Sequence, residues 1–305
     1  MEEKFMLGCS GAALSKVESM EEVLDSLKRA GFECVDFWLY RHSLEPKDPM
    51  LQGNWRDWVC ETKRKIRNAG LIVGQVHGIL NTYIPEDFHF EEPQIAAYRN
   101  LEAARMMECD RIVFHPAFYV HRVADEDTRR RVLDYNVRWF GKLLDTARTY
   151  QVRIQLENTF DFARVQKPED PPYPFTIAED LLTVMRGLGD ETVEACLDTG
   201  HGNACDQDVP AMIWTLGKRI GTIHLNDNYG NLKPAYPDMH LFPGYGTLRW
   251  DNVLRALRET GFSGVLNIEP VGSLLQLPKS VRDIQLKAAA DVLRELARLA
   301  GFPVE

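Results

Sequence analysis

The amino-acid sequence predicts an α/β protein folded as a (β/α)8 TIM barrel. Short β-rich runs alternate with longer helical patterns along the 305 residues, and each kind of segment occurs eight times. Most of the short runs are apolar, as in RIVFH from Arg111, which is typical of parallel strands buried on both faces. Eight strands that each precede a helix make up this barrel, and the chain exceeds the ~250 residues of a typical example, which leaves room for long loops.

The turn and cap residues support each element in order. Ser19 and an acidic first turn begin a predicted helix over 19–30 and Gly31 ends it, while Gly70 and Gly261 end two others. The predicted strands cover residues 4–10, 33–39, 71–78, 111–117, 152–158, 193–198, 220–226 and 264–270. The predicted helices cover residues 19–30, 54–69, 94–107, 127–150, 178–188, 209–218, 249–260 and 281–299.

A doubly wound open sheet is the alternative fold. That fold usually carries a GxGxxG fingerprint after its first strand, but here the first strand leads into GCSGAALS. No Pro-, Ser- or Gly-rich linker divides the chain, and the Pro-rich stretch 167–174 follows the fifth strand as a predicted loop. We therefore expect one domain over residues 1–305.

The composition of the chain disfavours two classes of binding partner, nucleic acid and anionic membranes. Lys and Arg number 36 against 45 Asp and Glu, a net charge of −9, which disfavours binding to nucleic acid or to an anionic membrane. The six cysteines form no CxxC pair, the N-terminus is acidic, and no long apolar segment is present. We expect a cytoplasmic protein with reduced thiols. No P-loop or dinucleotide motif indicates a nucleotide cofactor.

Side chains that suit a metal ion stand at the predicted strand ends, where barrels of this kind carry their sites. They are His77, His115, Glu157, Asp198, His201, His224 and Glu269, with Asp238 and His240 in the loop after the seventh strand. Any one of them could be a hydrogen-bonded core residue or a helix cap. Together they would bury several charges at one face, and a divalent cation removes that cost. The sequence therefore predicts a metal site at the C-terminal ends of the strands.

Other residues near these ends have weaker patterns. Trp38 and Tyr40 follow the second strand and Asn158 follows the fifth, where each could line a pocket or belong to the core. Asn158, Asn226 and Asp227 are also good turn formers. Cys196 and Cys205 flank the sixth-strand site without the spacing of metal ligands, and we expect them to be buried or incidental thiols. The other four cysteines are Cys9, Cys34, Cys60 and Cys109.

At these residues the chain resembles the sugar phosphate isomerase/epimerase superfamily, the xylose isomerase-like barrels that include AP endonuclease family 2, or endonuclease IV. The motifs are LENT around Glu157, LDTGH from Leu197, HLNDN from His224 and DMHLFPGYGTLRW from Asp238. The resemblance implies one divalent metal held by Glu157, Asp198, His224 and Glu269. It also implies that Glu157 and Glu269 are the acid/base pair and that His201 contacts substrate.

The resemblance implies an isomerase or epimerase of a small sugar, ketose or polyol, by proton transfer through a metal-stabilised enediolate. Mn²⁺ or Mg²⁺ suits the oxygen-rich ligands, and Co²⁺ or Zn²⁺ is an alternative. Ketose epimerases often carry an Arg six residues after the strand-seven His. Gly230 stands there, so recognition of the sugar is expected to differ.

Three alternatives stay open at this point. The same site could serve a keto-sugar or keto-inositol dehydratase or lyase. The chain also matches the larger ligand set of the endonuclease IV branch, a trinuclear zinc phosphodiesterase, through His77, His115, His201, Asp238 and His240; the acidic charge and the PGYG loop favour the sugar. A sugar-binding barrel without catalysis is the third alternative. A homo-oligomer is neither indicated nor excluded.

Overall fold

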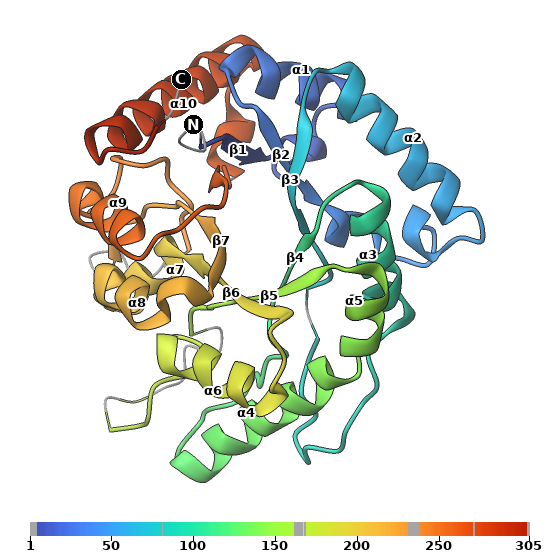
Figure 1. Ribbon diagram of the computed structural model, residues 1–305, viewed down its shortest axis with the longest axis vertical. Helices are drawn as coiled ribbons and strands as arrows, with labels where there is room; N and C mark the ends of the chain where they lie inside the picture. Colours follow the sequence, from blue (N-terminus) through green and yellow to red (C-terminus); the bar gives the residue numbers. More distant parts are fainter. Residues whose placement is uncertain are drawn as a thin grey trace.

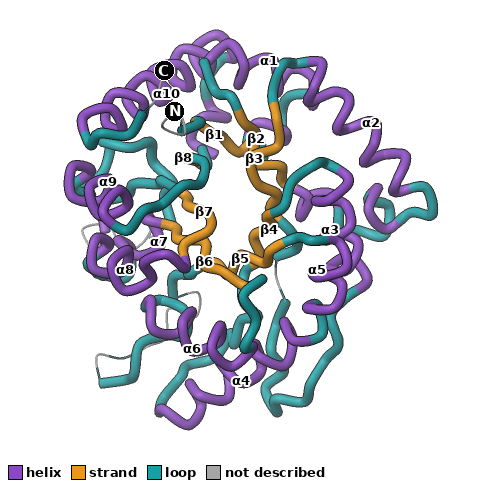
Figure 2. The backbone as a smooth tube through the Cα atoms, in the orientation of Figure 1, coloured by secondary structure: helices purple, strands orange, loops and turns teal. Residues whose placement is uncertain are grey.

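A ring of eight parallel strands surrounds the centre of the molecule, and helices cover the outside of the ring (Figures 1 and 2). The computed structural model describes residues 5–80, 82–161, 167, 169–230, 238–270 and 272–303. Lys4 of the first predicted strand, Pro168 of the Pro-rich stretch, and residues 304 and 305 lie outside them. The ring closes where Leu7 of the first strand pairs with Leu266 of the last. The predicted barrel is confirmed.

The strands lie within the predicted segments, and most are shorter by one to three residues at an end. They are β1 Leu7–Ser10, β2 Cys34–Trp38, β3 Ile72–His77, β4 Arg111–Phe114, β5 Arg153–Glu157, β6 Val193–Asp198, β7 Ile220–His224 and β8 Leu266–Ile268.

The helices follow the strands in the expected order. They are α1 Met20–Ala30, α2 Trp55–Asn68, α3 Ile95–Met106, α4 Glu126–Gly141, α5 Leu144–Tyr150, α6 Ala178–Leu188, α7 Thr199–Ala204, α8 Val209–Leu216, α9 Trp250–Glu259 and α10 Lys279–Leu299. Ser19 caps α1 in a reciprocal capping box with Glu22, and Gly31 ends the helix with a positive φ of 98°. Among the described residues, no helix is long and apolar enough to cross a membrane.

The prediction of one helix over 127–150 was wrong, because the chain breaks it into α4 and α5. An unbroken helix of that length would extend about 36 Å at ~1.5 Å per residue, well beyond a typical helix of three turns. The apolar pattern runs through the break because Leu143 and Leu144 remain buried there. The short helix α7 was also not predicted; it begins at the side chain of Asp198, which accepts a hydrogen bond from the His201 main chain.

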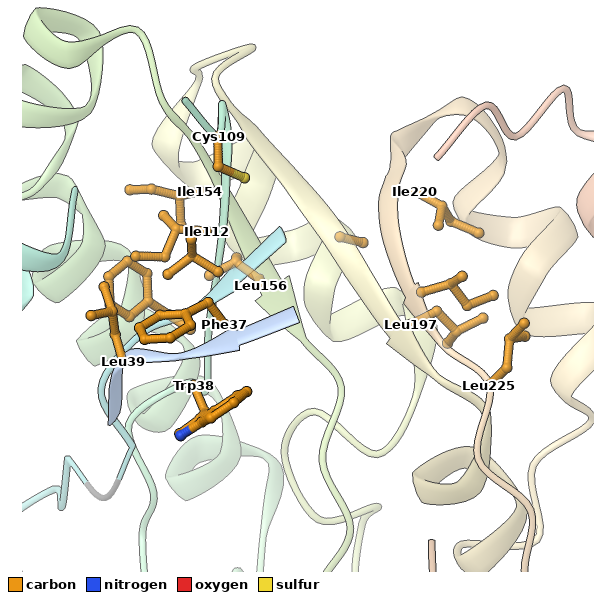
Figure 3. Close-up of a cluster of buried hydrophobic side chains, with 14 of the residues drawn as sticks. Phe37, Trp38, Leu39, Cys109, Ile112, Ile154, Leu156, Leu197, Ile220 and Leu225 are labelled. Carbon is orange, nitrogen blue, oxygen red and sulfur yellow. The ribbon is translucent and has the colours of Figure 1, made fainter. Parts of the chain in front are cut away.

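The apolar core lies between the strands and the helices. Figure 3 shows one part of it, where Ile112, Ile154 and Leu156 gather beside Phe37 and Leu39. Leu197, Ile220 and Leu225 form another part of it on the other side of the view.

The inner face of the barrel is polar, so the strands are not apolar on both faces as their runs suggested. Buried side chains there come from five strands: Asp36, Gln75, Gln155, Thr222 and Asn267. Residues alternate between the faces of a strand, and in β5 this places Gln155 against Glu194 of β6 while Leu156 joins the apolar core. The polar interior leads directly to the predicted site.

Candidate metal centre

The strand ends bring the predicted ligands together at one end of the barrel. His77, Glu157, Asp198 and His224 are the last residues of β3, β5, β6 and β7, whereas His115 and Glu269 follow β4 and β8 at once. His201 lies in α7, and Asp238 and His240 lie in the loop between β7 and α9. Parallel strands all end on the same side of a barrel, which is why residues so far apart in the sequence converge.

The central group consists of the four residues that the resemblance implied. Ligand atoms of Glu157, Asp198, His224 and Glu269 all lie within 4.8 Å of one another. His224 Nδ1 is 3.0 Å from Glu157 Oε1 and 3.0 Å from Glu269 Oε2. Asp198 Oδ2 lies 3.8 Å from the same nitrogen. Three carboxylates therefore surround one imidazole nitrogen.

The other predicted histidines form two groups beside this centre. Glu157 Oε2 lies 3.2 Å from His77 Nε2 and 3.0 Å from His115 Nε2. On the other side, ligand atoms of Asp198, His201 and His240 also lie within 4.8 Å of one another. Asp238 Oδ1 lies 2.6 Å from His240 Nε2 and 3.6 Å from His201 Nε2. All nine predicted ligands thus belong to one continuous cluster.

The chemistry of these atoms fits a cation. Glu157 Oε2, Asp238 Oδ1 and His240 Nε2 are buried, and they make no well-aligned hydrogen bond to any residue that the structure describes, despite close contacts. Buried polar atoms are rarely left without a partner. Carboxylate oxygens and imidazole nitrogens whose lone pairs converge in this way are the ligands of divalent ions.

The electrostatics of the cluster are strongly perturbed. Burial alone would raise the pKa of Glu157, but His224 and His115 reverse this and hold it well below its ordinary value. Burial also opposes the fall in the pKa of Glu269, yet His224 brings it to about 2. The pKa of His240 rises to about 9 because the attraction of Asp238 outweighs burial. Without a metal, the raised pKa of His201 and of His240 favours their protonated forms, which balance buried carboxylates, and an incoming cation would replace those protons.

Neighbouring amides fix the carboxylates in place. Asn226 Nδ2 donates to Asp198 Oδ2 at 2.5 Å, while Asn226 Oδ1 accepts from the main-chain N–H of Glu269 at 3.0 Å. The Asn158 side chain bonds the main chain of Asp198 in both directions. Asn226, expected only as a turn former, therefore holds two of the four central ligands.

The residues expected to line a pocket take different positions. Trp38 and Asn158 are fully enclosed, so neither lines the open surface of the site. Tyr40, in the short turn Leu39–His42, is half-buried, and its ring meets the His77 ring edge-on with centroids 5.2 Å apart. Among these three, Tyr40 is the one that lies at the accessible edge.

Three residues near the centre escaped the sequence reasoning. Gln75 contacts the far nitrogen of His224, with 2.7 Å between Nε2 atoms, and Asp36 Oδ2 lies 3.9 Å from that nitrogen. Burial, followed by the nearby Glu269, raises the pKa of Asp36 to about 7. Cys196, expected as a buried or incidental thiol, is buried, and its sulfur lies in a group with ligand atoms of Glu157 and His224. Only the alternation of residues along the strands could have indicated these side chains, since none forms a motif.

Asp227 anchors the loop that carries Asp238 and His240. It accepts five hydrogen bonds, from the main chain of Asn228, Gly244, Gly246 and Leu248 and from Trp250 Nε1. Asp227 is fully buried, and Trp250, whose Nε1 donates to it, is buried as well. A turn-forming role was expected for this residue, and the bonds extend it to the whole segment 244–250.

Removing this carboxylate should be costly. We expect Asp227→Ala to lower the free energy of unfolding by about 2–4 kcal/mol, because several donors lose their acceptor at once. Urea denaturation measures the change, and Asp251→Ala, at an exposed aspartate of α9, is the control. A difference below about 0.5 kcal/mol between the two variants would show that the loop does not depend on Asp227.

Comparison with known proteins identifies relatives of this chain. A region of D-psicose 3-epimerase from Enterocloster bolteae is 28% identical over 98 residues, covering 32% of this chain and 29% of that protein. Inosose isomerase from Bacillus subtilis is 24% identical over 170 residues, covering 55% of this chain and 56% of that protein. The chain thus spans about half or less of the length of these curated relatives.

The fold is shared more widely than the sequence. The IOLI protein, solved with a zinc atom bound, superposes with a TM-score of 0.70 at 15% identity, covering 97% of this chain and 99% of that one. The family model for xylose isomerase-like TIM barrels matches residues 24–300, which includes all nine predicted ligands. By this match over most of its length, the chain belongs to the xylose isomerase-like TIM-barrel family.

Proposed function

We propose that the protein is a divalent-metal-dependent isomerase or epimerase of a small sugar, ketose or polyol, with Glu157 and Glu269 as its acid/base pair. The observation that carries this proposal is the convergence of Glu157, Asp198, His224 and Glu269 within 4.8 Å of one another. These reactions remove a proton from carbon beside a carbonyl group and return it, which requires paired bases and stabilisation of an enediolate.

The donor set suggests the ion. Three carboxylates and one imidazole favour Mn²⁺ or Mg²⁺, while the further histidines would also suit Zn²⁺ or Co²⁺. A divalent ion held here would act as a Lewis acid that stabilises negative charge developing on substrate oxygens. Asn226 and Asn158 would keep the ligands oriented through the bonds described above.

The two glutamates can share the proton transfers. Each has an oxygen 3.0 Å from His224 Nδ1, so their carboxylates flank the same point from β5 and from the end of β8. The mechanism that we propose requires a bound substrate carbon to lie where each glutamate reaches one of its two faces. One glutamate would take the proton, and the other would return one to the opposite face.

The exposure of the cluster suits a small substrate. Glu157 and His224 are enclosed, whereas His115, His240 and Asp238 keep 15%, 16% and 30% of their side-chain surface exposed. A ligand would therefore approach from the side of the cluster where His115, Asp238 and His240 are partly exposed. The epimerase and isomerase activities of the relatives support a sugar as that ligand, and the zinc atom of the IOLI structure supports a metal.

Two other reactions would use the same residues. Elimination of water from an enediolate would make the protein a dehydratase or lyase of a keto-sugar or keto-inositol, and a product assay would distinguish it. A trinuclear zinc phosphodiesterase is favoured by one specific observation, the two additional ligand groups around His115 and His201. The number of ions separates that function from the first.

Metal loading is the first experiment. We expect about one tightly bound divalent ion per chain and a fall in melting temperature after chelation. An ion at 100 times its dissociation constant stabilises a fold by about 2.7 kcal/mol, which corresponds to a shift of roughly 5 °C at about 2 °C per kcal/mol. Elemental analysis and differential scanning calorimetry measure both quantities.

The controls follow from the ligand groups. Asp198→Asn should remove most of the shift, and Asp110→Asn, at the other end of the barrel, should keep it. Three zinc ions per chain together with cleavage of abasic-site DNA would replace the sugar assignment with the nuclease. No bound ion at all would exclude both.

A further inference from the structure

The two nitrogens of the His224 ring face opposite environments. Nδ1 faces the carboxylates of Glu157 and Glu269, each 3.0 Å away. Nε2 faces the interior of the barrel, where the amide nitrogen of Gln75 lies 2.7 Å away. Gln75 belongs to β3 and His224 to β7, so this contact crosses the barrel. Gln75 is buried, with 1% of its surface exposed.

The present contact suits a ring whose proton is on Nδ1. A neutral imidazole carries one proton, and the amide nitrogen of Gln75 can only donate. Nε2 therefore accepts from Gln75, while Nδ1–H points toward the two glutamates. Gln75 Oε1 has no hydrogen-bond partner among the described residues in this arrangement. A buried acceptor without a partner is costly, so an arrangement that gives Oε1 a donor would be favourable.

A metal ion on Nδ1 requires the opposite tautomer. The Nδ1 lone pair must then face the ion, and the proton moves to Nε2, which needs an acceptor. Rotation of the Gln75 amide by 180° exchanges its two ends and brings Oε1 to Nε2. The rotation would pair the unpartnered oxygen with the new N–H, and it would give up the hydrogen bond that the Gln75 amide makes to Asp36 in the present arrangement.

We propose that Gln75 is a positioning residue that selects the metal-binding tautomer of His224 by accepting the Nε2 proton through its amide oxygen. This inference rests on the metal centre of the proposed function. Gln75 touches neither ion nor substrate in this role. It sets the ring orientation and proton position through one hydrogen bond, and the same amide stabilises the metal-free tautomer when it is turned the other way.

Asp36 is the competing acceptor. Its Oδ2 lies 3.9 Å from His224 Nε2, beyond a hydrogen bond, and is 3.4 Å from Asn267 Nδ2. The shorter contact of Gln75 makes it the partner of the ring, and variants at both positions can test this choice.

The test measures Zn²⁺ affinity by competition with a chromophoric chelator. We expect Gln75→Leu to weaken Zn²⁺ binding by about 10–100-fold, the usual effect of losing such a partner. Gln155→Leu is the matched control, because it removes a buried glutamine of the barrel interior that bonds Glu194 and not His224. The Gln75→Glu variant retains an acceptor at this position and should keep most of the Zn²⁺ affinity. It keeps the proposal testable if the Gln75→Leu variant does not fold.

A second readout follows the tautomer itself. In Zn²⁺-loaded protein labelled with ¹⁵N-histidine, NMR should show a protonated, slowly exchanging Nε2 on His224. In Gln75→Leu this proton should exchange faster, and in Gln155→Leu it should be unchanged. A merely structural role of Gln75 would not move this signal.

The outcomes separate the two proposals. If the Gln75→Leu variant binds Zn²⁺ as tightly as the Gln155→Leu variant does, the proposed role of Gln75 is wrong, and the proposal of a metal centre is unaffected. Loss of affinity in Asp36→Asn without loss in Gln75→Leu would overturn it as well, in favour of Asp36. Wild-type protein that binds neither Zn²⁺ nor Mn²⁺ nor Mg²⁺ would overturn the proposed function and the role of Gln75 together.

Discussion

Glu157→Gln is expected to abolish turnover and to weaken metal binding at the same time. Oε1 of Glu157 faces His224, and Oε2 faces His77 and His115. The negative charge of Glu157 would therefore both attract the ion and stabilise the surrounding imidazoles. An amide keeps the shape but can neither take a proton nor balance a cation. Loss of a general base alone costs about 10²–10⁴-fold in rate, and the weaker metal site adds to it.

The comparison variant is Glu194→Gln. Glu194 lies in β6, the strand next to that of Glu157, and it pairs with Arg153 and Gln155 away from the cluster. Steady-state kinetics on a ketose that the wild-type protein converts, together with metal content, should show loss in the first variant and not in the second. Full turnover by Glu157→Gln would remove Glu157 from the mechanism.

Glu269→Gln should reduce turnover by a similar factor of about 10²–10⁴ but should lose less metal affinity. Glu269 has 13% of its side chain exposed and lies within 4 Å of two histidines, His224 and His240. Glu157 is enclosed and lies within 4 Å of four: His77, His115, His201 and His224. Its main chain stays anchored to Asn226, so the substitution should not disturb the other ligands. The expected signature is a large fall in kcat at saturating metal.

Isotope exchange refines this prediction. If the two glutamates act on opposite faces, Glu269→Gln should lose net conversion while Glu157 still exchanges its own substrate proton with solvent. Glu259→Gln, at an exposed glutamate of α9, provides the control. Unchanged kcat in Glu269→Gln would contradict the assignment of an acid/base pair.

Much of the site could be predicted because of the barrel's geometry. Once the strands are placed, their ends must share one face, so His77, Glu157, Asp198 and His224 had to meet wherever the exact bounds fell. The two ends of α1 could also be predicted, because the effects of Ser19 and Gly31 depend only on residues near them in the sequence. These features depend on neighbouring residues in the sequence or on a rule of the fold.

Contacts across the barrel could not be predicted. Gln75 and Asp36 lie in apolar runs, and the register shifts in β2–β3 pairing between Val35 and Asp36 change which residues oppose each other. The meeting of Gln75 with His224 depends on two strands on opposite sides of the ring. The break between α4 and α5 was also hidden, because buried residues continue through it.

Solvent deuterium tests the central claim most directly. Metal-loaded wild-type protein is incubated in D₂O with a panel of ketoses and keto-inositols, and NMR follows the carbon beside each carbonyl. The account predicts deuterium at that carbon in at least one compound, dependent on the ion and absent in Glu157→Gln. Metal-loaded protein that exchanges no such proton in any of them, while it cleaves abasic-site DNA, would contradict the account.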